Sequence, residues 1–395
     1  MRRTGLLAIV VAGLLAGFRG EAAGQTGKPA PPGLARCEQV VFRHALDHAR
    51  PFIVRIDTIG GAQPIRTEVD RRGRSRRTAA FRQADGPTTG VIYSSDGLIL
   101  TSSFNFVRDP TVITVTLADG RRFVAELVAR DYPCRLALLK IEARDLPAAD
   151  WSPRTREGGA GDLRLRVGQR VLAAGYGFGT REPAPAAGIL SALWRMSGQA
   201  VQTDARISPA HYGGPLLDIE GRVVGICVPM GPGEDALAGV QWYDSGIAFA
   251  IPRDHLAGRV ARMARGETLR RGLLGLNLDT RARVVGGEPK APARLQPAAA
   301  SQPARPLPPD GLRIVGEPVG PAAKAGLRRG DVITHIDNVP TPDVVALRRE
   351  LARRAAGDTI AVRYRRDGKV HEVSVTLATS DELRVGAASQ PSPSR

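Results

Sequence analysis

The sequence predicts a mainly β protein over the larger part of its 395 residues. Between residues 38 and 255, short runs rich in β-branched residues alternate with turns that contain Gly, Asp and Pro. Such regular spacing is typical of antiparallel all-β domains. Two turns, Ser95-Asp96-Gly97 and Ala118-Asp119-Gly120, have the residues that a tight hairpin requires. The expected strands are 52–59, 90–94, 112–117, 123–129, 136–141, 171–175, 223–228 and 246–251.

The N-terminal residues 1–24 have the pattern of a signal peptide. Two arginines precede the apolar run 5–18, and residues 21–24 read Glu-Ala-Ala-Gly. The run is too short to span a bilayer comfortably. We therefore expect an exported protein of the periplasm or cell envelope, with an uncleaved membrane anchor as the alternative. Residues 25–49 are expected as a separate N-terminal segment.

The chain has a formal net charge of +17, which arises mainly from arginine. Five arginines cluster between two strand-like runs, where we expect a loop: Arg71, Arg72, Arg74, Arg76 and Arg77. Blocks of like charge are usually solvated, but they also attract phosphate, anionic lipid or acidic polysaccharide. A solvated loop and a polyanion contact therefore both stay open. Nucleic acid is the least expected polyanion for an exported protein.

The three cysteines, Cys37, Cys134 and Cys227, do not make a disulfide framework, and at most one bridge can form among them. Cys227 lies in the apolar strand 223–228, where we expect a buried and inert thiol. No Cys-x-x-Cys pair occurs in the sequence. We therefore expect no structural metal and no cofactor.

The stretch 201–216 has the most informative motif of the chain. It reads V-Q-T-D-A-R-I-S-P-A-H-Y-G-G-P-L and resembles the nucleophile loop of the HtrA (Deg) family of trypsin-like proteases, D-A-x-I-N-P-G-N-S-G-G-P-L. The resemblance places Tyr212 at the position of the family's serine. It also makes Ala210 and His211 part of a vestigial oxyanion loop.

Two further segments resemble the family's text around the other members of its catalytic triad. Residues 96–101 look like the strand that leads into T-x-x-H, and Phe104 stands at the position of the His. Residues 131–141 match D-x-x-x-D-L-A-V-L-K-I, with Arg135 at the position of the Asp. The resemblance implies a trypsin-like double β-barrel over residues 50–255, with six strands in each barrel and the vestigial site in the cleft between them.

The three replacements remove the chemistry of a triad. Phe104 has no proton acceptor, Arg135 keeps its proton at every working pH, and the phenol of Tyr212 has no base beside it. Losing a triad typically costs about a million-fold in turnover. We therefore interpret the chain as a pseudoprotease rather than an enzyme. The alternative is a serine endopeptidase with a relocated nucleophile, for which the candidate groups are Ser102, Ser103, Ser208, His211, Cys134 and Cys227.

The C-terminal part resembles a PDZ domain, an α+β fold, over residues 268–378, after an expected linker helix at 256–267. Residues 320–333 read G-P-A-A-K-A-G-L-R-R-G-D-V-I, close to the family's S-P-A-A-x-A-G-L-x-x-G-D-V-I. The resemblance also implies a carboxylate-binding loop, whose backbone N–H groups would capture the C-terminus of a polypeptide while the peptide adds as a strand. The residues of this loop are Leu274, Gly275 and Leu276.

Three further expectations concern this domain. The second wall of its groove is a helix that begins near Thr341, with Pro342 at its first position. The helix continues through Val345, Leu347 and Leu351. The sequence leaves open which of these residues line the groove and which face the core. Residues 279–310 are rich in Ala, Pro and Arg, which indicates a flexible insertion that could cover the groove, and 379–395 are expected as a disordered tail.

Together, these patterns favour an exported HtrA-like pseudoprotease that acts as a polypeptide-binding scaffold or chaperone-like protein. A periplasmic quality-control protease with a relocated nucleophile is the first alternative, and a polyanion-binding envelope protein is the second. The family commonly forms trimers, so a homotrimer is one assembly that the resemblance implies.

Overall fold

The structure is a computed structural model that describes residues 33–60, 66–69, 75–78, 87–107, 109–152, 165–177, 180–231, 245–279 and 311–383. The expected signal peptide and residues 280–310 of the expected insertion lie outside this part of the chain, as do Arg71, Arg72 and Arg74. Within the described ranges, no helix combines the length and the apolar character that a membrane crossing requires.

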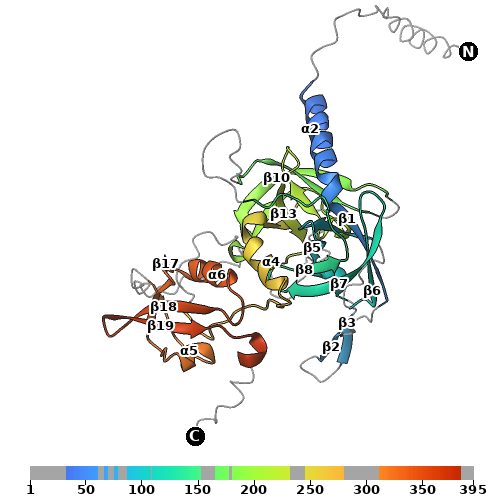
Figure 1. The fold of residues 1–395 in the computed structure, drawn as a ribbon. Coiled ribbons are helices and arrows are strands. Elements are labelled where there is room, and N and C mark those ends of the chain that lie inside the picture. Colours follow the sequence, from blue (N-terminus) through green and yellow to red (C-terminus); the bar gives the residue numbers. More distant parts are fainter. Residues whose placement is uncertain are drawn as a thin grey trace, which may run out of the picture. The chain divides into compact units, whose positions relative to one another are not determined.

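Six antiparallel strands close the first barrel in the order β1-β4-β5-β8-β7-β6, and β1 completes the ring by pairing with both β4 and β6 (Figure 1). Ile53, Ile99 and Leu138 are fully buried in its core, so apolar burial holds the closed sheet. The predicted hairpins connect β4 to β5 and β6 to β7, with Gly97 at φ +102° and Gly120 at φ +91°. The strands are β1 (Ile53–Ile59), β4 (Thr88–Ile92), β5 (Leu98–Ser102), β6 (Val112–Thr116), β7 (Arg122–Asp131) and β8 (Leu136–Ile141).

The second barrel is also closed by six strands, in the order β10-β11-β14-β13-β12-β9. Strand β13 of this barrel is buried at every position and has the bounds that the sequence predicts. A short helix, α3 (Arg195–Gly198), connects β10 to β11. The double barrel is therefore confirmed. The strands are β9 (Arg170–Gly175), β10 (Ala184–Trp194), β11 (Ala200–Thr203), β12 (Pro215–Leu217), β13 (Val223–Val228) and β14 (Ala248–Pro252).

Two elements near the N-terminus differ from the expectations. The segment before the first strand contains helix α2 (Leu34–Ala49), whose Ala45 and Ala49 are fully buried in the core of the barrels. A separate hairpin pairs β2 (Arg66–Val69) with β3 (Ser75–Thr78). The expectation of one loop across the arginine cluster is therefore wrong at Arg76 and Arg77, because their main chain pairs with β2.

The C-terminal domain has its own sheet, in the order β15-β16-β18-β19 with β17 paired to β16, and its own apolar core. The expected helix begins later than predicted. Asp343 is extended at φ −143° and its Oδ1 accepts from the N–H of Ala346 at 2.7 Å, so Asp343 caps the helix and Pro342 precedes it. The elements are β15 (Leu312–Arg313), α5 (Pro321–Lys324), β16 (Val332–Ile336), β17 (Val339–Pro340), α6 (Val344–Ala352), β18 (Thr359–Arg366) and β19 (Lys369–Thr376).

The chain does not become irregular at residue 379. Residues 380–383 form a helical turn. Thr379 N–H donates to Glu382 Oε2 at 2.8 Å and Glu382 N–H donates to Thr379 Oγ1 at 3.3 Å, a reciprocal cap that starts the turn. The expected disorder is therefore wrong for 379–383, and the remainder of the tail lies outside the described residues.

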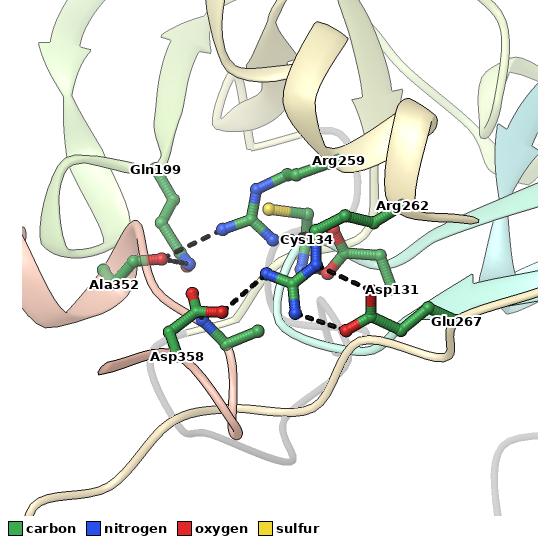
Figure 2. A network of polar contacts seen from close by, with 9 residues as sticks. Asp131, Cys134, Gln199, Arg259, Arg262, Glu267, Ala352 and Asp358 are labelled. Carbon is green, nitrogen blue, oxygen red and sulfur yellow. Dashed lines mark hydrogen bonds and ion pairs between the residues drawn. The ribbon is translucent and has the colours of Figure 1, made fainter. Parts of the chain in front are cut away.

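A buried arginine connects the first barrel to the C-terminal domain (Figure 2). The linker helix is α4 (Ala257–Met263), shorter than the expected 256–267. Its Arg259 donates through Nη1 to Asp131 Oδ2 at 2.7 Å and through Nη2 to the carbonyl of Ala352 at 3.1 Å. Gln199 Nε2 donates to the same carbonyl at 2.7 Å. Because Ala352 is the last residue of α6, the guanidinium lies at the negative end of that helix.

A second arginine of α4 adds to this network (Figure 2). Arg262 donates through Nη1 to Asp358 Oδ1 at 2.9 Å and through Nε to Glu267 Oε2 at 2.9 Å. Asp358 Oδ2 also accepts from the N–H of Ala355 at 2.8 Å. The side chain of Asp131 is 0% exposed and that of Arg259 is 11% exposed. The carboxylate of Asp131 is therefore shielded from water, and the guanidinium of Arg259 is largely shielded.

Replacing Arg259 by Met should destabilise the protein by about 3–5 kcal/mol, because the buried carboxylate of Asp131 loses its counter-charge. The measurement is the free energy of unfolding from urea titration. Arg265→Met is the matched control, since Arg265 lies just after α4 and donates to the carbonyl of Ala261 from an exposed position. Equal stability losses in the two variants would contradict this account of the pair.

Candidate functional site

The rings of Phe104 and Tyr212 meet edge to face where the resemblance places the family's His and Ser. Their centroids are 5.3 Å apart with an interplanar angle of 81°, and each residue is 7% exposed. Phe104 lies in the 3-10 turn Ser103–Phe106 of the first barrel, and its N–H donates to the Ser102 hydroxyl at 3.3 Å. Tyr212 directly follows the 3-10 turn Pro209–His211 of the second barrel. The two aromatic side chains therefore fill the position at which the barrels meet.

The main chain of Arg135 joins this site from the turn between β7 and β8. Its carbonyl accepts from Ser103 N–H at 2.8 Å and from Ser102 Oγ at 3.1 Å, the residues directly before Phe104. Arg135 has a left-handed backbone, with φ +57°. The structure therefore brings all three predicted positions together, through side chains at Phe104 and Tyr212 and through the backbone at Arg135.

The predicted oxyanion loop is wound into a turn that engages the N–H groups of His211 and Tyr212. In a triad protease, the N–H of the nucleophile helps to bind the oxyanion. Here the N–H of Tyr212 donates to the carbonyl of Pro209 at 3.2 Å, and that of His211 donates to Ser208 at 2.9 Å. The carbonyl of Ala210 accepts from the Thr89 hydroxyl at 2.7 Å. The N–H of Tyr212 is therefore already bonded within the turn.

Ser208 and His211 form a close polar pair at the start of this turn. Ser208 Oγ lies 3.0 Å from His211 Nδ1, and the N–H of Ser208 donates to the same Nδ1 at 3.2 Å. Nδ1 is thus an acceptor, which places the proton of a neutral ring on Nε2. Burial lowers the pKa of His211 below its usual value, so the ring is neutral at pH 7. Within the described residues, no ion pair joins His211 to a carboxylate.

The cysteines do not offer a better nucleophile. All three are free thiols, and Cys134 and Cys227 are buried. Burial raises the pKa of both buried thiols, that of Cys227 to about 12, so neither ionises near neutral pH. In the part of the chain that the structure describes, no cluster of three His, Cys, Asp or Glu residues has the arrangement of a metal site.

In the predicted carboxylate-binding loop, two backbone carbonyls are bonded within the C-terminal domain. The carbonyls of Leu274 and Gly275 accept from Ala322 and Val319 at 3.0 and 2.9 Å. Among the described residues, no N–H of Leu274, Gly275 or Leu276 donates to another backbone carbonyl. Gly275 has φ +79°, and a Cβ there would lie 2.1 Å from Val319 O. The loop therefore requires glycine at this position.

The three apolar residues of α6 that the sequence left open differ in their burial. Leu347 is buried in the core of the C-terminal domain, and Leu351 packs against that core, whereas Val345 is 56% exposed. The helical turn at 380–383 lies close to the carboxylate-binding loop, because a Cβ on Gly320 would lie 2.3 Å and one on Gly275 3.2 Å from Leu383 Cδ2. Sequence reasoning missed Leu383, and it also missed Thr89, which reads in the sequence as an ordinary strand residue.

Comparison with known proteins gives two domain matches. Residues 88–226 match the trypsin-like peptidase domain, and residues 313–377 match the PDZ domain. The second match begins after the carboxylate-binding loop at 274–276, so the role of that loop stays a prediction.

Named relatives extend these matches over most of the chain. A probable periplasmic serine protease do/HhoA-like of Haemophilus influenzae is 32% identical over 81% of this chain and 63% of its own length. Periplasmic serine endoprotease DegP of Escherichia coli K12 is 30% identical over 76% of this chain and 59% of its own. The chain thus spans about three fifths of the length of these relatives.

Solved structures match as well. The HtrA-type protease AlgW with tripeptide superposes with a TM-score of 0.59 at 25% identity, over 85% of this chain and 96% of that one. The serine endoprotease from Yersinia pestis gives a TM-score of 0.54 at 26% identity, over 85% and 97%.

The lowered pKa of His211 predicts a loss of stability in mild acid. As the pH falls below about 6.5, the unfolded chain binds a proton at this residue before the folded chain does. Between pH 7.5 and 5.5, the protein should therefore lose more unfolding free energy than His211→Gln, which lacks this titration. Urea titrations at both pH values measure the difference. Equal losses in the two proteins would contradict a depressed pKa.

Proposed function

This chain belongs to the HtrA (Deg) family of trypsin-like peptidases with a PDZ domain, and on that premise we propose that it binds polypeptides without cleaving them. The observation that carries the proposal is the contact between Phe104 and Tyr212, two buried rings at the positions of the family's base and nucleophile. A phenyl ring accepts no proton, so the side chain at the position of the family's His cannot take one from Tyr212.

The surroundings of the two rings support this proposal. The resemblance places Arg135 where a carboxylate would orient the base, and an arginine cannot supply that carboxylate. The N–H of Tyr212 is bonded to Pro209, so the transition-state donor that often survives the loss of a triad is also engaged. The replaced side chains and the bonded N–H of Tyr212 thus both support binding without hydrolysis.

Hydrolysis with a relocated nucleophile is the second candidate function. The names of the relatives favour it, since they are serine proteases, and the 3.0 Å contact between Ser208 Oγ and His211 Nδ1 is its structural support. Against it, Nδ1 is shared with the N–H of Ser208, which weakens its capacity to take the hydroxyl proton. The pair is also a local cap of the turn Pro209–His211, a role that explains its geometry without catalysis.

We assign polypeptide capture to the PDZ domain. The N–H groups of Leu274, Gly275 and Leu276 lack backbone partners among the described residues, so they suit a terminal carboxylate. AlgW, with which this chain shares its fold, has been solved with a tripeptide, which favours a peptide ligand here. Because the relatives are named as periplasmic, the proposed place of action is the periplasm. A homotrimer and a polyanion contact through the arginine cluster remain predictions.

Peptides with a free C-terminal carboxylate should bind this protein, and their amidated forms should bind at least about tenfold more weakly. Calorimetry with a C-terminal peptide library measures this difference. Gly275→Ala should abolish binding, because its Cβ meets Val319 O. The matched control is Gly326→Ala, which has nearly the same φ of +78° but nothing within 4 Å of the added Cβ. Failure of every free peptide, or equal binding by amidated peptides, would count against C-terminal capture.

Cleavage is tested separately, with a fluorophosphonate probe and an unfolded casein substrate. The purified protein should neither become labelled nor degrade casein, while trypsin does both under the same conditions. Labelling that disappears in Ser208→Ala would instead establish the relocated nucleophile. This variant retains the residues that the proposal depends on, Phe104 and Tyr212.

A further inference from the structure

The hydroxyl of Thr89 joins two segments of the second barrel from a strand of the first. Thr89 lies on β4 and is 0% exposed. Its Oγ1 donates to the carbonyl of Ala210 at 2.7 Å and accepts from the N–H of Tyr176 at 2.7 Å. A threonine hydroxyl has one hydrogen to donate, and here that hydrogen is directed at the middle residue of the turn Pro209–His211.

The main chain on both sides of Tyr212 is packed against the same threonine. A Cβ at Gly213, where φ is +88°, would lie 2.4 Å from Thr89 O and 2.2 Å from Thr101 Oγ1. Thr101 Oγ1 itself donates to Thr89 O at 2.7 Å. Asn105 Nδ2 donates to Thr101 Oγ1 at 3.0 Å and to the carbonyl of Tyr212 at 3.3 Å. Buried polar groups from the first barrel thus hold the carbonyls of both Ala210 and Tyr212.

Opening the turn requires its peptide groups to rotate. The N–H of Tyr212 becomes available to a ligand only if it leaves Pro209 O. This movement changes the orientation of the peptide groups between Pro209 and Tyr212, and it therefore strains or breaks the bond from Thr89 to Ala210 O. Ala210 is half-buried, so a carbonyl that loses this bond regains water only in part, and the loss is costly. Thr89 therefore favours the wound turn over an open one.

We propose that Thr89 is a positioning residue that latches the turn Pro209–His211 in its wound form. The inference rests on the proposed absence of hydrolysis and adds a second cause for it. The bonded N–H of Tyr212 then prevents catalysis in addition to the three replaced side chains. Restoring His, Asp and Ser at 104, 135 and 212 is therefore not sufficient to recover a trypsin-like site, because the oxyanion donor stays engaged.

The neighbouring threonine supplies a matched control. Thr88 is also buried on β4, at 6% exposure, but its hydroxyl donates to Ile56 O at 3.4 Å within the first barrel. Thr88→Val and Thr89→Val therefore remove the same atoms from adjacent positions of one strand. Only the second change removes the bond to Ala210. Thr89→Ser keeps a hydroxyl and should keep the latch.

Native-state amide exchange tests the latch in the full chain. In Thr89→Val, the amides of residues 208 and 210–214 should exchange about tenfold faster than in the wild-type protein, because the bonds of the hydroxyl to Ala210 O and to the N–H of Tyr176 are both lost. Thr88→Val and Thr89→Ser should exchange at wild-type rates in this segment. Unchanged exchange in a folded Thr89→Val protein, or an equal increase in Thr88→Val, would overturn the proposal. Thermal melting identifies any variant that has not folded.

A second measurement uses a restored triad. The variant Phe104→His/Arg135→Asp/Tyr212→Ser should react slowly with a fluorophosphonate, and adding Thr89→Val should raise the labelling rate at least about tenfold, whereas adding Thr88→Val should not. Equal rates with and without Thr89→Val would reject the latch. Hydrolysis by the wild-type chain would instead reject the proposed function, and the exchange experiment would still decide the role of Thr89.

Discussion

The space between the ends of the two barrels is occupied, and the behaviour of the site depends on that constraint. The rings of Phe104 and Tyr212 close it from opposite barrels, with their centroids 5.3 Å apart. Behind them, Thr89 and Asn105 donate to the carbonyls of Ala210 and Tyr212, and Thr101 donates to the carbonyl of Thr89. Close-packed interiors tolerate little change in volume, so a substrate carbonyl would have to displace well-packed side chains in order to enter.

Polypeptide binding can persist in such a molecule because it uses different atoms. Catalysis by a triad needs particular side chains in contact, and each replacement removes one of them. A PDZ loop needs backbone N–H groups and a glycine with a positive φ, and Gly275 meets this need at φ +79°. Under the proposed function, the two activities are therefore separable in sequence, because the loop at Gly275 does not need the side chains at positions 104, 135 and 212.

Much of the architecture was predictable from local patterns, whereas the bonds that hold the site were not. The burial of 223–228 and the turn at Gly97 follow from apolar runs and turn chemistry. The resemblance to the family's motifs predicts that Phe104 and Tyr212 lie together. The role of Thr89 depends on a partner 121 residues away, and in sequence it is only one more β-branched residue. Asp343 was overlooked as a cap because Pro342 gave a competing start signal.

The contact of Leu383 with the carboxylate-binding loop has a thermodynamic consequence. Its Cδ2 lies against Gly275 and Gly320, so the helical turn at 380–383 and a bound peptide share one structural element. Linkage is reciprocal: if docking of the turn stabilises the ligand-ready loop, a ligand must stabilise docking of the turn by the same free energy. Under the proposed peptide capture, the residues after the last strand would therefore contribute to the affinity of the loop for its ligand.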